Sequence, residues 1–154
     1  MKASFFDQLK SQSPFSLIDE QSLEAWLENA KLLTFRPGER ILRPDEISDA
    51  IFLVIRGQVR ILENDVIDDS SFTLDLRGSG QLLGWINLLR GGPTEYVQAS
   101  TETTLLALPA SGFVRLYKDF DEFAEFFDNQ PNPHESYQVY SAYLESQFKK
   151  ESSW

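Results

Sequence analysis

Short apolar runs separated by turn residues fill the middle of the chain, and a helical spacing of apolar residues flanks them on both sides. Runs rich in β-branched and aromatic residues predict strands, here at residues 32–35, 40–42, 51–55, 59–62, 72–76, 96–100 and 104–108. The run at 51–55 is nearly all apolar, as in a strand buried on both faces, whereas 59–62 alternates as a strand with one wet face does. This series of short strands predicts a mainly β fold, a jelly roll or a barrel.

Two glycine-containing turns divide the first strands. Pro37-Gly38 is a turn dipeptide, and Arg56-Gly57-Gln58 separates two apolar runs. Gly57 can adopt the positive φ of a tight hairpin turn without a steric penalty. Residues 35–62 therefore predict a strand, a turn and a hairpin, an arrangement that occurs throughout antiparallel sandwiches and barrels.

Before the strands, the sequence predicts two helices. Residues 4–10 favour a short helix, which the Ser and Pro residues at 11–14 interrupt. Asp19 is a good N-cap for an amphipathic helix over residues 20–31 that lies on the sheet. Its buried face is predicted to comprise Leu23, Trp26, Leu27 and Ala30, with Trp26 in the core.

After Pro109 the spacing becomes helical again, and three further helices are expected. Phe113, Leu116, Tyr117 and Phe120 share one face, and Phe123, Phe126 and Phe127 belong to a second short helix. Residues 129–133 end it, and residues 134–150 resume with an aromatic stripe of Tyr137, Tyr140, Tyr143, Leu144 and Phe148. Such a stripe requires a partner surface: the chain's own sheet, a second copy in a homodimer, or a following domain.

Composition limits the functions that this chain can have. The 154 residues, 42% of them hydrophobic, suit one folded unit with a sizeable core. No apolar run approaches the roughly 18 residues of a membrane span, and the N-terminus lacks the apolar core of a signal peptide. We therefore expect a cytoplasmic protein that does not insert into a membrane itself.

The charge of the chain argues against nucleic acid as a partner. Its net charge of -10 comes from 24 acidic and 14 basic residues, and such a surface repels phosphates. The acidic clusters at 63–69 and 119–128 are interpreted as solvated loop and helix surface, since neither provides the spaced ligands of a calcium loop.

No catalytic or metal-binding constellation is evident. The chain has no cysteine, and its one histidine, His134, lies outside the strands, which excludes a cupin-type metal site. Paired carboxylates such as Asp68 and Asp69, or Asp119 and Asp121, are interpreted as solvated surface rather than acid–base groups. We therefore predict no catalysis, no metal and no bound cofactor.

The order of helix, β core and two helices, together with the glycine punctuation of 35–62, resembles the cyclic nucleotide-binding domain over roughly residues 14–129. The resemblance implies a jelly-roll-like β-barrel with N-terminal and C-terminal helices. It divides the chain into a cyclic nucleotide-binding-like domain at 1–130 and a C-terminal helix or linker at 131–154.

Within that family a phosphate-binding cassette reads Phe-Gly-Glu, a few apolar residues, then Arg-Ala and a strand. The resemblance implies that a short helix and the Arg hold the cyclic phosphate, while the Glu accepts a ribose hydroxyl. Residues 82–99 match this cassette. Gly84 retains the glycine, Trp85 replaces the Glu, and Pro93, Thr94 or Glu95 stands where the Arg would be.

These departures predict a degenerate cassette. The candidate ligand-binding residues are Gly84, Trp85, Ile86, Asn87, Arg90, Thr94 and Glu95. Trp85 is bulky enough to fill the ribose space, and Glu95 would repel a phosphate, so an empty or self-plugged site is preferred to cyclic nucleotide binding. In the alternative, the Gly91-Gly92 loop swings Arg90 inward to bind another anion. Another departure, at Pro44-Asp45-Glu46, is a turn substitution.

Residues 83–91 and 99–109 are similar to the cyclic nucleotide-binding-like domain at the N-terminus of bacterial toxin or bacteriocin secretion ABC transporters. This similarity implies a regulatory domain on the cytoplasmic side of a transporter, with the stripe at 134–150 directed toward the other domains. The competing hypothesis is a free-standing dimeric sensor of a cyclic nucleotide or another small anion. Neither hypothesis includes a DNA reader, because residues after Pro133 provide only one helix.

Overall fold

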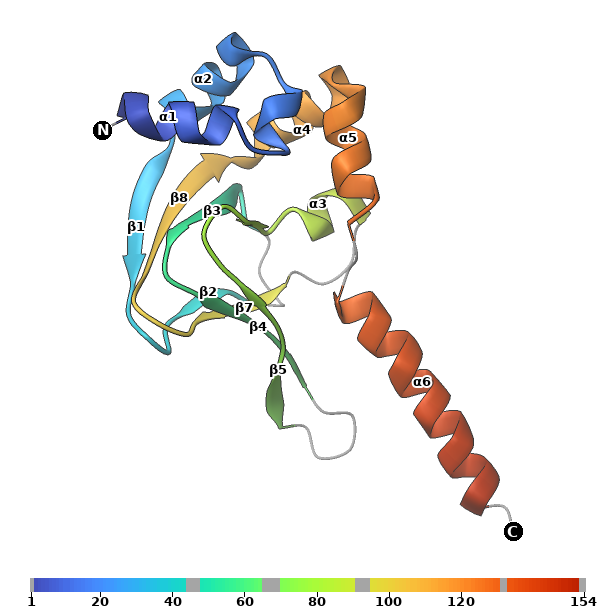
Figure 1. Ribbon diagram of the computed structural model, residues 1–154. Helices are drawn as coiled ribbons and strands as arrows, with labels where there is room; N and C mark the ends of the chain where they lie inside the picture. Colours follow the sequence, from blue (N-terminus) through green and yellow to red (C-terminus); the bar gives the residue numbers. More distant parts are fainter. Residues whose placement is uncertain (1, 44–47, 65–69, 91–94, 131–132, 153–154) are drawn as a thin grey trace.

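In the computed structural model, two antiparallel sheets lie under a layer of helices, and one long helix leaves the body (Figure 1). The structure describes residues 2–43, 48–64, 70–90, 95–130 and 133–152. The first sheet has the order β1-β8-β3-β6 and the second β2-β7-β4-β5, with antiparallel pairing throughout.

The bounds of the strands are β1 Lys31–Phe35, β2 Arg40–Leu42, β3 Ala50–Arg56, β4 Val59–Asn64, β5 Ser71–Arg77, β6 Leu82–Leu83, β7 Tyr96–Ala99 and β8 Thr103–Pro109. All seven predicted strands are confirmed. Only β6 was not expected, since two residues are too few to show a pattern. The mainly β, jelly-roll-like prediction is also confirmed, but the strands form two four-stranded sheets and not one closed barrel.

Apolar side chains between the two sheets form the sheet-interior cluster. Its buried members are Leu42, Phe52, Val54, Val59, Ile61, Leu83, Val97 and Leu105. Because alternate residues of a strand point to opposite faces, β3 also contributes Ile51 and Leu53 to the other side of the first sheet. Residues 51 to 54 are all buried, which confirms the prediction for this strand.

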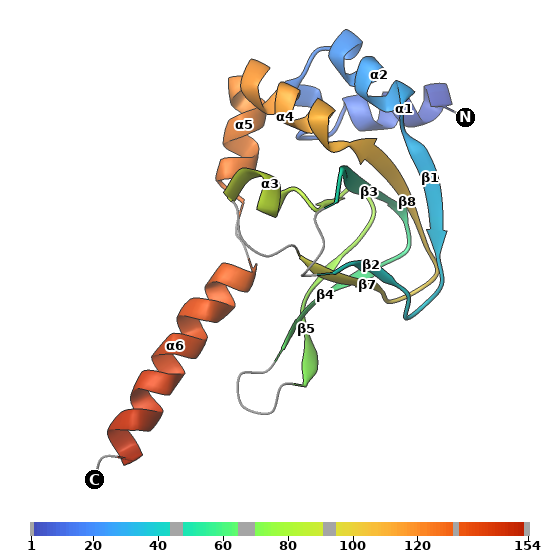
Figure 2. The same ribbon diagram turned by 180° about the vertical axis from the view of Figure 1, so that it is seen from behind.

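The outer face of the first sheet is covered by helices, and their apolar side chains form the helix-side cluster (Figure 2). These elements are α1 Lys2–Lys10, η1 Phe15–Leu17, α2 Glu20–Glu28, α4 Ala110–Asp119 and α5 Asp121–Asp128. Phe113, Phe123 and Phe127 are at most 1% exposed and contact one another edge-to-face at 5.0–5.6 Å. The phenylalanines of the two predicted helices are therefore packing residues.

Helix α2 begins as expected but ends early. The Asp19 carboxylate accepts a hydrogen bond from the Ser22 N–H at 2.7 Å, which confirms the predicted N-cap. The helix stops at Glu28 and not at residue 31, because Lys31 is already paired with Ala107 in the sheet. Strand pairing thus takes over the last residues of the helical pattern.

Trp26 is a core residue, as predicted, and fixes α2 to α4. Its indole Nε1 donates to the Pro109 carbonyl at 3.0 Å, and its ring lies against Gly112. A Cβ at position 112 would collide with the Trp26 ring, so this approach depends on the missing side chain. Both predicted turn glycines have positive φ, 89° at Gly38 and 100° at Gly57.

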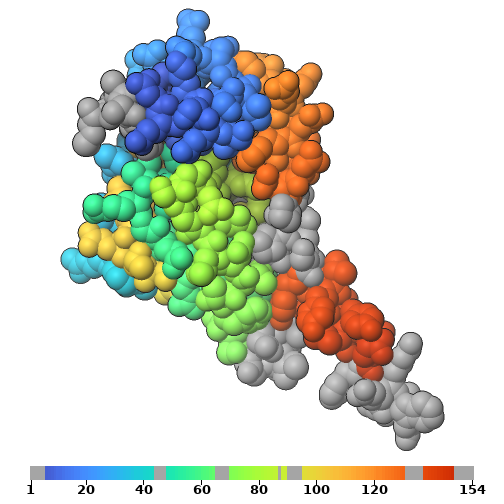
Figure 3. All heavy atoms as spheres, in the orientation of Figure 1, coloured from blue at the N-terminus to red at the C-terminus, as the bar shows by residue number. Residues whose placement is uncertain are grey.

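Helix α6, Pro133–Ser152, extends away from the body and meets it beside β5 (Figure 3). Tyr137 contacts Phe72 of β5 edge-to-face at 5.2 Å between ring centroids. Four other apolar side chains of α6 are exposed, namely Val139, Tyr140, Tyr143 and Leu144. Among the stripe side chains that the structure describes, Tyr137 near the N-terminal end contacts the chain's own sheet, and the side chain of Phe148 lies outside the described residues.

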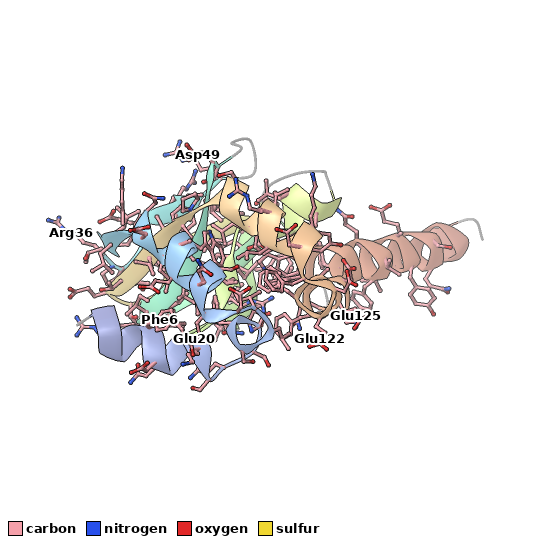
Figure 4. All side chains as sticks on the ribbon, turned by 90° about the horizontal axis from the view of Figure 1, so that it is seen from above. Phe6, Glu20, Arg36, Asp49, Glu122 and Glu125 are labelled. Atoms are coloured by element: carbon pink, nitrogen blue, oxygen red, sulfur yellow. The ribbon has the colours of Figure 1, made fainter. Side chains whose placement is uncertain are left out.

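The acidic stretch at 119–128 is helix surface, as interpreted. Seen from above, Glu122 and Glu125 lie along α5, and both are exposed (Figure 4). Among the described residues, no helix is both long and apolar enough to cross a membrane.

Candidate functional site

The segment that corresponds to the cassette connects the two sheets. Strand β6 pairs with β3 through Phe52↔Leu83, and after Gly84 and Trp85 the chain forms the short helix α3, Ile86–Arg90. The Leu89 N–H donates to the Trp85 carbonyl at 3.3 Å, which confirms the predicted helical turn. The chain then re-enters the second sheet at β7.

Gly84 allows the change of direction between β6 and α3. Its φ is +85°, in the left-handed region that residues with a Cβ rarely adopt. The position is also close to its surroundings, since an added Cβ would lie 3.4 Å from Leu42 Cδ1 and 3.6 Å from the Ala50 carbonyl. The glycine is therefore required by the backbone itself, whatever the site binds.

Trp85 points away from the space between the sheets. Its side chain is 7% exposed and belongs to the helix-side cluster, where its ring contacts Phe127 of α5 edge-to-face at 4.9 Å. The expectation that this ring fills the space of a ribose stays a prediction. The positive φ of Gly84 and the apolar surface of α5 together place the indole on the helix side.

Glu95 and Ile86 are both buried. Glu95, 6% exposed, lies immediately before β7, next to the Tyr96↔Leu62 pair. The resemblance implies an arginine at position 93, 94 or 95, and of these three residues the structure describes Glu95. Ile86, 7% exposed, packs in the helix-side cluster with Trp85.

For three other candidate ligand-binding residues, the structure does not describe the side chain. Asn87 and Arg90 belong to α3, but their side chains lie outside the described residues, as does Thr94. The turn at Pro44-Asp45-Glu46 lies outside them too. The inward swing of Arg90 accordingly stays a prediction.

Sequence reasoning did not identify a basic residue that lies against β7. The Arg40 guanidinium carbon is 5.1 Å from the centroid of the Tyr96 ring, a cation–π geometry. Also on β7, the Gln98 Nε2 donates to the Gly38 carbonyl at 2.6 Å. The register of β2 and β7 brings these residues together, which spacing along the chain could not reveal.

Two small cavities lie on the outer side of the first sheet. One, of about 140 Å³, is bounded by Trp85, Phe127 and the turn before β6. The other, of about 130 Å³, lies beneath Leu9 of α1, against Leu53 of β3. Both are lined by Gly80, and neither was evident in the sequence because each is built from segments far apart in the chain.

A family model described as the cyclic nucleotide-binding domain matches residues 32–120. No curated protein sequence matches the chain. Among solved structures, the sensor domain of the transcriptional regulator DNR from Pseudomonas aeruginosa superposes with a TM-score of 0.72 at 16% identity, over 96% of this chain and 93% of that one.

Longer proteins of the same architecture also match. The regulatory subunit of a cAMP-independent protein kinase A from Trypanosoma brucei, in a mutant form bound to cAMP, gives a TM-score of 0.74 at 19% identity over 90% of this chain and 50% of that one. The catabolite activator protein of Thermus thermophilus gives 0.60 at 22% identity, over 92% and 62% respectively. The chain thus spans about half of the kinase subunit, and these likenesses show the fold.

Proposed function

The chain belongs to the cyclic nucleotide-binding domain family, and we propose that it is a non-catalytic regulatory domain whose cassette no longer selects a cyclic nucleotide. One observation carries the proposal: the chain keeps the glycine turn and the short helix of the cassette, while the resemblance aligns Trp85 with its Glu and Pro93, Thr94 or Glu95 with its Arg. On this alignment, the turn and the short helix remain, whereas the two side chains that bind the nucleotide in the family are replaced.

The energetic consequence follows from the two missing partners. A hydrogen bond to a charged group contributes about 1.5–3 kcal/mol, and about 1.4 kcal/mol changes affinity tenfold. Loss of both the arginine and the ribose-binding acid would therefore lower the affinity for a cyclic nucleotide by about 100- to 10,000-fold. In the proposed alignment, a carboxylate at position 95 would add repulsion of a phosphate.

A thermal-shift titration with cyclic AMP and cyclic GMP tests this proposal. A ligand at 100 times its dissociation constant stabilises the folded state by about 2.7 kcal/mol, which raises the melting temperature of a domain of this size by several degrees. We expect no saturable rise at millimolar nucleotide. A saturable rise in melting temperature would contradict the proposal and show that the domain binds a cyclic nucleotide.

We further propose that residues 1–130 form the regulatory unit and that residues 131–154 lead from it to an effector, in the N-terminal part of a toxin-secretion ABC transporter on its cytoplasmic side. The exposed apolar residues of α6 support a partner along residues 134–150. The sequence of the gene beyond the codon for Trp154 tests whether the domain belongs to such a transporter. Continuation beyond Trp154 into a peptidase, membrane spans and an ATPase supports it, and a stop codon there contradicts it.

The second candidate is a free-standing sensor that forms a homodimer through α6 and binds a cyclic nucleotide or another small anion. The exposed positions of α6 favour it equally, and the chain covers 93% of the DNR sensor domain. Sedimentation of the isolated chain separates the candidates: a concentration-independent monomer argues for an excised regulatory domain, and a stable dimer for the sensor.

A further inference from the structure

We propose that the cavity beside Trp85 binds a small planar carboxylate with one aromatic ring. The cavity lies between the segment before η1, the turn that joins β5 to β6, and the C-terminal part of α5. Its lining includes Pro14, Arg77, Gln81, Trp85, Phe126 and Gln130.

The size of the cavity limits its ligand. Its volume of about 140 Å³ is close to that of the ~150 Å³ engineered cavity that is known to accept benzene. A nucleotide or any other drug-sized molecule needs a pocket of about 300 Å³ or more. A six-membered ring with a single substituent matches this volume.

The walls favour an aromatic ring. The side chains of Trp85 and Phe127 meet edge-to-face at 4.9 Å, and those of Phe126 and Phe127 do so at 5.2 Å. Aromatic rings prefer offset or edge-to-face neighbours with centroids 4.5–7 Å apart, so this corner provides such partners for one more ring.

Arg77 is a charged residue in the lining of the cavity. Its side chain is 22% exposed, and it contacts the Asp75 carboxylate through Nη2 at 3.1 Å. A guanidinium carries five N–H donors in a planar fork that matches a carboxylate, and contact with Asp75 restricts its orientation. The amides of Gln81 and Gln130 add polar surface to the lining. An acid group on the ring is therefore favoured over an amine.

Occupancy of this cavity would be transmitted to the helices. Trp85 lies directly before α3, and Phe127 lies in the last turn of α5, shortly before α6 begins. A ligand in this cavity lies beside the Trp85–Phe127 contact, and a change in that contact would alter the packing of α5. The site would thus control α6 without any ligand in the cassette.

Benzoate is the probe for this proposal, with cyclohexylamine as a probe of opposite charge and no aromatic ring. In an NMR titration of the full chain, benzoate should shift the Gly80 and Gln81 amides and the Trp85 indole N–H saturably at millimolar concentration or below. Cyclohexylamine should not. Absence of a saturable shift with benzoate, or shifts centred on residues of the sheet-interior cluster, would overturn the proposal.

Two pairs of variants locate the site. Ser13→Phe fills the cavity from its rim, whereas Ser11→Phe adds the same bulk at an exposed position outside the lining. Arg77→Gln removes the cation, whereas Arg56→Gln removes an exposed arginine elsewhere. Benzoate affinity should fall at least tenfold in Ser13→Phe and Arg77→Gln and change less than twofold in the controls. Equal affinity across all four would refute the site, and unchanged spectra away from the mutations confirm that each variant is folded.

Discussion

At residue 85, an indole ring that the resemblance places at a ligand-binding position serves as a core side chain. Trp85 is buried against Phe127, so its loss removes both apolar area and an aromatic contact. We predict that Trp85→Ala lowers the free energy of unfolding by about 3–5 kcal/mol, while Trp85→Phe costs clearly less. Urea denaturation measures both. A Trp85→Ala variant within about 0.5 kcal/mol of wild type would show that the ring is not packed as described.

At Gly57, both the backbone conformation and the neighbouring backbone atoms disfavour a side chain. Its φ is +100°, and an added Cβ would lie 2.5 Å from the Glu102 carbonyl oxygen. We predict that Gly57→Ala destabilises the fold by at least about 1–3 kcal/mol, because both the conformation and the contact are unfavourable. Gly78→Ala is the matched control, since a methyl group at that position would meet no atom within 4 Å. Similar urea midpoints for the two variants would contradict this interpretation.

Asp19 gives the stability a dependence on pH. The Ser22 backbone N–H that the carboxylate accepts holds the pKa of Asp19 below its usual value of 3.8. The folded state therefore binds this proton less readily than the unfolded state, so the stabilisation is present above the unfolded pKa and is lost as the pH falls through the folded one.

We predict that the stability difference between wild type and Asp19→Ala is largest near neutral pH and shrinks as acid protonates the cap. Asp19→Asn is the control, because its amide oxygen can cap the helix without titrating. Chemical denaturation across the acidic range measures both differences. A wild-type advantage over Asp19→Ala that persists unchanged in acid would exclude this role.

At the scale of elements, α6 carries the clearest unpartnered surface. Residues advance about 100° around a helix at each step, so Val139, Tyr140 and Tyr143 share one side, whereas Gln138 lies away from it. In the proposed dimer, Tyr143→Glu places a charge in an apolar interface and should raise the dissociation constant at least about tenfold. Gln138→Glu should leave it almost unchanged. Sedimentation equilibrium measures both, and equal effects would argue against this side of α6 as the interface.

The elements were more predictable than the ends of the elements. Strand β3 was evident because it is apolar on both faces, and α4 and α5 because their phenylalanines recur at helical spacing. The end of α2 was not evident from the sequence, since Ala30 and Lys31 also fit a helical pattern. The helix ends earlier because Lys31 pairs with Ala107 in the sheet. Likewise, β6 is defined by its partner β3 and by no pattern of its own.

For the molecule as a whole, two apolar clusters on opposite faces of the first sheet determine the architecture. The order of elements was sufficient to predict the fold, and the family match over residues 32–120 agrees with it. The site was predicted less completely. Sequence position placed Trp85 in the cassette, but its direction depends on the φ of Gly84 and on Phe127, which is 42 residues later in the chain.

We propose that this domain keeps the fold of the cyclic nucleotide-binding family but no longer binds a cyclic nucleotide specifically. Isothermal titration calorimetry of the full chain with cyclic AMP, at protein concentrations high enough to detect millimolar binding, tests it most directly. We predict no saturable heat, because the proposed cassette lacks the Arg and the Glu that bind the phosphate and the ribose in the family. A saturable isotherm with one nucleotide per chain would contradict this proposal and show that the domain is a cyclic nucleotide sensor.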